Sequence, residues 1–260
     1  MNRAIATLVR RHDPDRFLTA LFAPPAKRDA LLTLYAFNHE LARAREAVSE
    51  PLLALIRLQW WREVVEGARR RHEVAEPLAA AIDAGELDRA DLLALIGGRE
   101  IEVEPAIETL QAWRAYVLAT AGGLAVAAGR LLGAPDPEVL RPLGAAYGIA
   151  GLLRSVAAHA RQGRCMLPED VLAEHGLTRE QVIANPAAAT APALMRQMIG
   201  EGLVLLDGAV RLPRRAIAAA LPAVLARRDL GRAPAIHAQR GLGDRLAVML
   251  AGIAGRITIP

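Results

Sequence analysis

Apolar residues recur three or four positions apart along most of the chain, with polar residues between them. This is the period of a helix that buries one face. The pattern is clearest over residues 26–48 and 51–71, where it predicts two long helices. Apolar periods bounded by prolines and glycines predict further helices over 14–24, 77–85, 88–96, 108–132, 137–161, 178–185, 194–207, 213–227 and 242–254.

The segments between these helices carry residues that end helices. Gly97-Gly98 is expected to stop the helix over 88–96, and residues 163–176 are expected to be irregular. Residues 256–259 resemble a strand, but no second strand is predicted to pair with them. No repeat and no long linker divides the chain. Residues 1–260 are therefore predicted to form a single all-α domain.

The composition also favours packed helices. Hydrophobic residues make up 53% of the chain and aromatic residues only 3%, so the apolar mass is mainly alanine, leucine, valine and isoleucine. β-Sandwich cores depend more on aromatic and β-branched side chains. A hydrophobic fraction this high also argues against intrinsic disorder.

The positive charge of the chain comes from arginine. The formal net charge is +4, and Lys27 is the only lysine. The arginines are scattered, whereas a nucleic-acid-binding protein concentrates its basic residues and interleaves them with aromatic ones. We therefore expect no nucleic-acid partner, and an anionic ligand or lipid surface suits the charge better.

A single cysteine, Cys165, excludes an internal disulfide and is typical of a reducing compartment. No apolar run reaches the length of about 20 residues that a membrane-spanning helix needs. The sequence thus predicts a cytoplasmic protein, and peripheral contact with a membrane stays open.

Several kinds of catalytic site are excluded by their missing motifs. Gly241-Leu242-Gly243-Asp244 lacks the third glycine of a dinucleotide-binding loop, and no strand is predicted before it. The histidines never pair at the spacing of zinc ligands on a helix. Neither Ser49 nor Ser155 lies in a nucleophile elbow.

Three segments place polar groups on otherwise apolar helices: residues 35–46, 57–62 and 148–161. Together with Phe22-Ala23-Pro24, Gly163-Arg164 and Leu167-Pro168-Glu169-Asp170, they resemble the squalene/phytoene synthase family. The resemblance covers most of the chain in order. It implies an isoprenoid-synthase-type helical bundle around a central cavity.

Active members of that family bind two prenyl diphosphates through Mg²⁺, held by aspartates on two facing helices. The resemblance assigns those metal-ligand positions to Ala42, Glu46, Ser155 and His159, of which only Glu46 is a carboxylate. It therefore implies no clear catalytic residue and at most a weak metal ligand, Glu46. No cofactor is expected, and Mg²⁺ enters only if the protein is a working synthase.

The basic side chains of the family's pocket are retained. Arg43, Arg57, Arg154 and Arg164 are candidate substrate-binding residues, because guanidinium groups bind phosphate oxygens in pairs. Such a pocket, surrounded by apolar helices, is expected to hold an anionic lipid or a prenyl diphosphate without a metal.

The string Arg57-Leu-Gln-Trp-Trp-Arg62 and the absence of aspartate after Arg154 resemble one branch of the family, that of complex I assembly factor 6. This implies a non-catalytic lipid-binding or respiratory-complex assembly protein, with complex I assembly partners and a location peripheral to the inner membrane. The alternatives are an active prenyltransferase that condenses two prenyl diphosphates head to head, and an unrelated helical protein.

Overall fold

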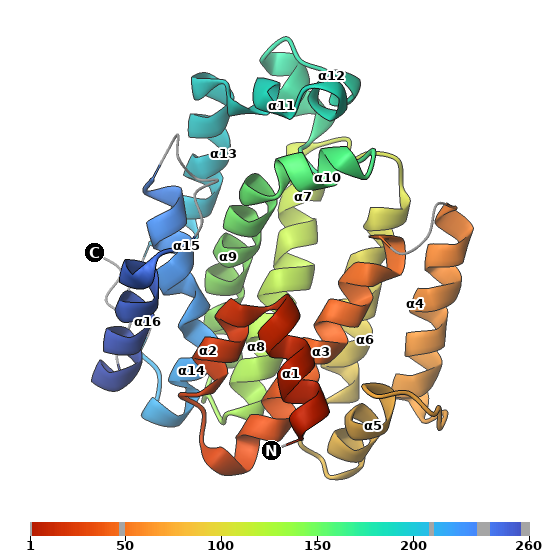
Figure 1. Ribbon diagram of the computed structural model, residues 1–260, viewed down its shortest axis with the longest axis vertical. Helices are drawn as coiled ribbons and strands as arrows, with labels where there is room; N and C mark the ends of the chain where they lie inside the picture. Colours follow the sequence, from red (N-terminus) through yellow and green to blue (C-terminus); the bar gives the residue numbers. More distant parts are fainter. Residues whose placement is uncertain (1, 47–49, 208–210, 233–239, 256–260) are drawn as a thin grey trace.

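Helices form all the regular secondary structure of the residues described in the computed structural model, which are 2–46, 50–207, 211–232 and 240–255 (Figure 1). The α-helices are α1 (Arg3–His12), α2 (Pro14–Ala20), α3 (Pro25–Glu46), α4 (Pro51–Glu66), α5 (Ala75–Asp83), α6 (Arg89–Arg99), α7 (Leu110–Val117), α8 (Gly123–Leu131), α9 (Arg141–Arg154), α10 (Val156–Arg161), α11 (Glu169–Glu174), α12 (Arg179–Ala184), α13 (Pro192–Val204), α14 (Ile217–Ala220), α15 (Pro222–Leu230) and α16 (Leu242–Ala254). The shorter helical turns are η1 (Glu100–Val103), η2 (Leu118–Gly122), η3 (Pro137–Leu140), η4 (Pro186–Thr190) and η5 (Arg214–Ala216).

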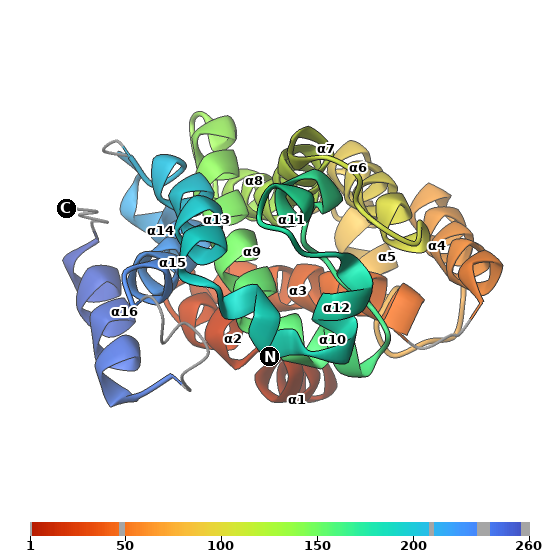
Figure 2. The ribbon, with the colours of Figure 1, turned by 90° about the horizontal axis from the view of Figure 1, so that it is seen from above.

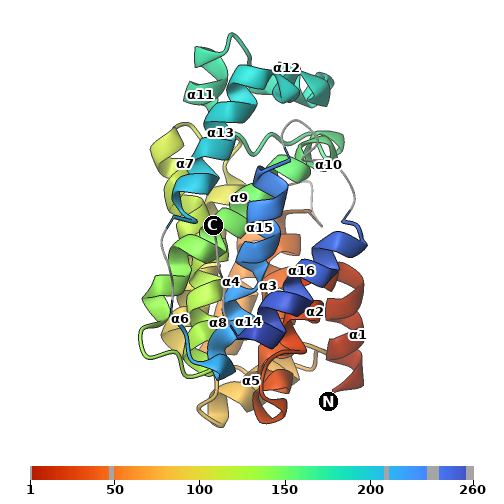
Figure 3. The ribbon, with the colours of Figure 1, turned by 90° about the vertical axis from the view of Figure 1, so that its left-hand side faces the viewer.

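The centre of the bundle is α3. Every residue from Ala30 to Asn38 is buried, so this helix is covered on all sides. Figure 2 shows α3 lying among α9, α8 and α6, with α1 and α2 across one side of it and α4 at the edge. Figure 3 shows α11 and α12 at one end of the bundle and α16 along a side. The predicted all-α fold is confirmed.

Two glycines let α9 approach the chain before α8. An added Cβ at Gly144 would lie 2.4 Å from the carbonyl oxygen of Ala121, and one at Gly148 would lie 2.6 Å from the Cβ of the same alanine. The Ala121 segment is η2, a π-helical turn that continues α7 into α8. Turns of this type are frequent at functional sites, and this one forms part of a cavity wall.

Most predicted helices are present, but several predicted boundaries are wrong. α6 passes through Gly97-Gly98 and ends at Arg99, because Gly98 packs closely against Ala119. The expected irregular segment 163–176 contains α11. The helix predicted over 137–161 is interrupted at Ser155.

Besides α11, the helix α1 is also absent from the predicted set. The side chain of Asn2 accepts hydrogen bonds from the backbone N–H groups of Ala4 and Ile5, which caps the first turn. The capping box predicted at Thr178 and Gln181 is confirmed at the start of α12. Residues 256–259 lie outside the described part of the chain. Among the described helices, none is both long and apolar enough to cross a membrane.

Candidate functional site

A cavity of about 300 Å³ opens between α3 and the α9–α10 pair. The first two helices, the ends of α6 and α7 and the turn η2 complete its wall. The lining residues are His12, Asp13, Arg16, Asn38, His39, Ala42, Arg99, Tyr116, Val117, Thr120, Ala121, Tyr147, Gly148, Gly151, Leu152, Ser155 and His159. The lining is therefore mixed, with nitrogen-bearing side chains among small and apolar residues.

The α9–α10 wall carries two of the predicted motif positions. Ser155 and His159 lie one turn apart on the same face, and the backbone N–H of His159 donates to the carbonyl of Ser155 at 2.9 Å. Gly151 lies one turn before Ser155 on this face, and an added Cβ there would meet nothing within 4 Å. The wall is therefore open in front of Gly151.

The α3 wall carries a third motif position, Ala42, together with Asn38 and His39. The fourth position, Glu46, is the exposed last residue of α3 and does not line the cavity. The structure thus brings together three of the four motif positions named from the sequence. None of these three is a carboxylate.

Two histidine nitrogens in the wall are buried without a partner among the described residues, Nε2 of His39 and Nδ1 of His159. The ring of His39 stacks on that of His12, with centroids 4.4 Å apart. Burial lowers the pKa of His39, and it lowers that of His159 to about 4, with a further contribution from the charge of Arg164. Both rings are therefore neutral at pH 7, and each has an unused nitrogen.

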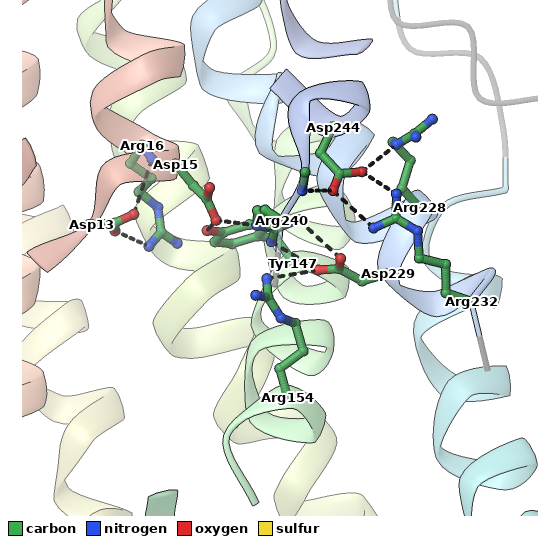
Figure 4. Close-up of polar contacts among 11 residues, drawn as sticks. Asp13, Asp15, Arg16, Tyr147, Arg154, Arg228, Asp229, Arg232, Arg240 and Asp244 are labelled. Carbon is green, nitrogen blue, oxygen red and sulfur yellow. Dashed lines mark hydrogen bonds and ion pairs between the residues drawn. The ribbon is translucent and has the colours of Figure 1, made fainter. Parts of the chain in front are cut away.

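The inner end of the cavity is closed by Arg16. Its side chain is only 12% exposed, and Nη1 lies 2.8 Å from Oδ2 of Asp13. The guanidinium lies over the ring of Tyr147, 4.7 Å from the centroid. Figure 4 shows the two side chains next to each other. Beyond Arg16 and Tyr147 the interior leaves a void of only about 10 Å³. A ligand is therefore limited to the outer cavity.

A second arginine in the wall, Arg99, is only 13% exposed and bonds to two side chains. Its Nη1 donates to Glu102 at 2.6 Å and its Nη2 to Asn38 at 3.0 Å. The hydroxyl of Tyr116 donates to the same carboxylate oxygen of Glu102 at 2.6 Å. Burial raises the pKa of Tyr116, so its proton stays in place. This cluster fixes the orientation of Asn38 and Arg99 in the cavity wall.

The four arginines named from the sequence are not brought together. Arg43 is exposed and lies 3.4 Å from Glu40. Arg57 lies on α4, no residue of which lines the cavity. Arg164 donates to the carbonyl of Glu102 at 3.3 Å and acts on His159 only through its charge.

The fourth of these arginines, Arg154, faces away from the cavity. Its Nη1 lies 3.4 Å from Oδ2 of Asp229 on α15. The same carboxylate accepts from Arg240, which also contacts Asp15, and the hydroxyl of Tyr147 donates to Asp15 (Figure 4). The expectation of one pocket lined by these four arginines is therefore wrong.

The cationic residues that do line the cavity, Arg16 and Arg99, were missed by sequence reasoning. The signal for Arg16 was present, because Asp13 precedes it by one turn of a helix that Pro14 begins. For Arg99 no signal was available, since its position depends on a helix that continues through two glycines.

The side chains in the cavity do not fit Mg²⁺. This ion prefers carboxylate, phosphate and water oxygens. The one carboxylate in the wall, Asp13, is paired with Arg16, and the carboxylate of Glu102 is paired with Arg99. Within the described residues, no three His, Cys, Asp or Glu side chains gather as a metal site requires.

Comparison with known proteins identifies relatives of this chain. The family model described as squalene/phytoene synthase matches residues 9–248. Complex I assembly factor 6 from Mus musculus is 29% identical over 68% of this chain and 55% of its own length. Presqualene diphosphate synthase from Sinorhizobium fredii is 27% identical over 68% of this chain and 67% of its own. Phytoene synthase from Cereibacter sphaeroides is 29% identical over 86% of this chain and 65% of its own.

Solved structures share the fold. A dehydrosqualene synthase superposes with a TM-score of 0.70 at 15% identity, over 97% of this chain and 95% of that one. The squalene synthase HpnC from Alicyclobacillus acidocaldarius gives a TM-score of 0.64 at 18% identity, over 98% and 94% of the two chains. The expected isoprenoid-synthase-type bundle is confirmed. Only a little more than half the length of the assembly-factor relatives is matched by this chain. With the family model matching nearly the whole sequence, the chain belongs to the squalene/phytoene synthase family.

Proposed function

We propose that this protein is a non-catalytic member of its family that binds one ligand with a polar head and serves in the assembly of respiratory complex I. The observation that carries the binding proposal is the group of nitrogen-bearing side chains that lines the cavity, Arg16, Arg99, His39 and His159. The guanidinium groups of Arg16 and Arg99 have N–H donors beyond those that bind Asp13, Glu102 and Asn38, and an anionic head can accept hydrogen bonds from them.

The ligand class follows from the size and polarity of the cavity. A volume of about 300 Å³ is at the lower end of the range for small-molecule sites, and the void behind Arg16 is too small to extend it. This suits the head and first carbons of a single prenyl diphosphate or anionic lipid. Condensation of two prenyl diphosphates requires a cavity large enough to hold both substrates.

The assembly role is supported by the relatives named as complex I assembly factor 6, of which those from Mus musculus and Homo sapiens are 29% and 27% identical to this chain. The proposed partners are therefore complex I subunits or their assembly intermediates. The proposed location is cytoplasmic and peripheral to the inner membrane, where such partners are found.

A second candidate function, head-to-head prenyl transfer, is favoured by the relatives named presqualene diphosphate synthase and phytoene synthase. It requires a metal to polarise the leaving diphosphate, and the donor set of the cavity argues against one. An enzyme of this kind would bind its substrate only in the presence of Mg²⁺.

Calorimetry with farnesyl diphosphate, with and without Mg²⁺, separates the two functions. We expect saturable binding that is independent of Mg²⁺ and no squalene or phytoene product. Gly151→Leu should abolish binding, because its side chain would fill the open space in the wall. The matched control is Gly200→Leu, another helical glycine with open space around it, which should bind normally. Mg²⁺-dependent binding with product formation would establish the enzyme instead.

A further inference from the structure

The last helix, α16, attaches to the bundle by a face that is small and polar. Asp244, Val248 and Gly252 are the buried residues of this helix, at one-turn intervals. The carboxylate of Asp244 accepts from Arg228 at 2.7 Å and from Arg232 at 3.0 Å (Figure 4). An added Cβ at Gly252 would lie 2.5 Å from the ring of Phe22, so the backbone of α16 is held close to the body.

The outer face of α16 has the opposite character. Five large apolar side chains on it are exposed, by 42–77%: Leu242, Leu246, Met249, Leu250 and Ile253. Their spacing of three and four residues places them in one stripe along the helix. A helix on the surface of a protein normally turns such a stripe inward, and a contiguous exposed patch of this kind marks an interaction surface.

The surroundings of the stripe are basic. Arg245 is exposed on α16 itself. It lines a groove of about 580 Å³ together with Arg10 of α1, Phe17 and Leu21. Neither arginine pairs with a carboxylate in the described part of the chain. Figure 3 shows α16 beside α2, with α1 on the same side of the bundle. Arg228 and Arg232 share a single carboxylate, which leaves a further positive charge nearby.

We propose that the outer face of α16, with Arg245 and Arg10 beside it, docks the protein on a bilayer rich in anionic phospholipid. An aliphatic stripe flanked by arginines matches a bilayer surface in two respects. The apolar side chains enter the boundary of the acyl chains, and the guanidinium groups bind lipid phosphates. The stripe has no polar position within it, whereas protein interfaces combine apolar contacts with direct hydrogen bonds.

This surface gives a physical basis to the peripheral membrane location proposed above, and it is separate from the cavity. The helix α16 packs against α15 and α2. None of its residues forms part of the cavity wall. Membrane binding and cavity binding can therefore be measured one without the other. If the membrane-docking proposal fails, the cavity-binding proposal still stands, and the reverse also holds.

Cosedimentation of the full chain with vesicles tests the proposal. We expect binding to phosphatidylcholine vesicles that contain about one phosphatidylglycerol in three, at least tenfold tighter than to phosphatidylcholine alone. Leu246→Gln combined with Leu250→Gln should weaken this binding about tenfold or more. Arg245→Ala should weaken it several-fold and leave the remaining binding less sensitive to salt.

A matched control exists on α4, where Leu52 and Ile56 are 65% and 56% exposed. Leu52→Gln combined with Ile56→Gln removes a similar amount of exposed apolar surface, and it should leave vesicle binding unchanged. Met249→Trp provides a readout that does not depend on a loss of vesicle binding. The fluorescence emission of the new indole should shift to shorter wavelength when anionic vesicles are added.

Three outcomes would overturn the proposal. The first is a folded wild-type protein that does not bind anionic vesicles, or binds neutral ones equally well. The second is equal loss of binding in the α16 and α4 variants. The third is a dimer in solution that the α16 variant alone dissociates, since a second copy would then cover the stripe.

Discussion

Arg154 of α9 and Asp229 of α15 are joined across the bundle, with 3.4 Å between Nη1 and Oδ2. Asp229 is only 3% exposed and also contacts Arg240 at 2.9 Å. Burial raises the pKa of Asp229, and the charges of Arg240 and Arg154 oppose that shift. The two arginines therefore offset part of the cost of burying this carboxylate, and Arg154 acts between helices, outside the cavity.

Arg154→Ala is expected to leave the affinity for a cavity ligand unchanged within about twofold and to cost about 1 kcal/mol of stability, because Arg240 still neutralises Asp229. Arg240→Ala, which removes the closer partner, should cost about 3 kcal/mol or more. Urea denaturation and calorimetry measure both quantities. If Arg154→Ala abolished binding and spared stability, the ligand-binding role inferred from the sequence would be correct.

His159 should make stability dependent on pH. Its pKa in the folded protein is about 4, below the ordinary value of 6.5. Between these two pH values the unfolded chain therefore binds a proton at His159 that the folded chain does not bind. Stability should therefore fall as the pH is lowered from about 6.5 to about 4, by about 2 kcal/mol between pH 7 and pH 5. Urea midpoints at the two pH values measure this loss. His159→Gln should remove that part of it, and parallel pH profiles for the two proteins would contradict the assignment.

Carboxylates placed at the motif positions should create a metal site. In the triple variant Ala42→Asp, Ser155→Asp, His159→Asp, the pair on α9–α10 would face the new aspartate on α3 across the cavity. We expect Mg²⁺ to tighten the binding of a prenyl diphosphate at least tenfold in this variant and to have no effect on the wild type. Calorimetry with and without Mg²⁺ makes the comparison. A metal response in the wild type would mean that another set of ligands is used.

The approach of α9 to η2 should tolerate no added methyl group. Gly144→Ala places a Cβ against the backbone oxygen of Ala121, which cannot move as a side chain would. We expect a loss of about 1–3 kcal/mol in unfolding free energy. Gly200→Ala has open space and should instead stabilise by about 0.5–1 kcal/mol, since alanine is the better helix former. Equal stability of the two variants would show that the helices separate easily.

The sequence predicted the helices well wherever apolar periodicity and caps agreed. The bounds of α16 are those predicted. Ser155 and His159 line the same cavity because a spacing of one helical turn places them on one face. The predicted end of α6 before Gly97-Gly98 was wrong, because local helix propensity gives no information on how Gly98 packs against another helix.

The arginines show the limit of sequence reasoning about the site. Arg154 and Ser155 are adjacent in the chain, yet a step of one residue in a helix turns the side chain by about 100°. Only Ser155 faces the cavity. The partner of Arg154 is 75 residues away, and no local pattern identifies such a partner.

The attachment of α16 has an evolutionary consequence. The helix is held by Asp244 and by the close contact of Gly252 with Phe22, while its outer residues make no demand on the fold. Substitutions along that outer face are free to drift or to be selected without disturbing the cavity. Under the proposed role of this face, changes in five side chains of one helix would alter membrane binding and leave the interior of the bundle as it is.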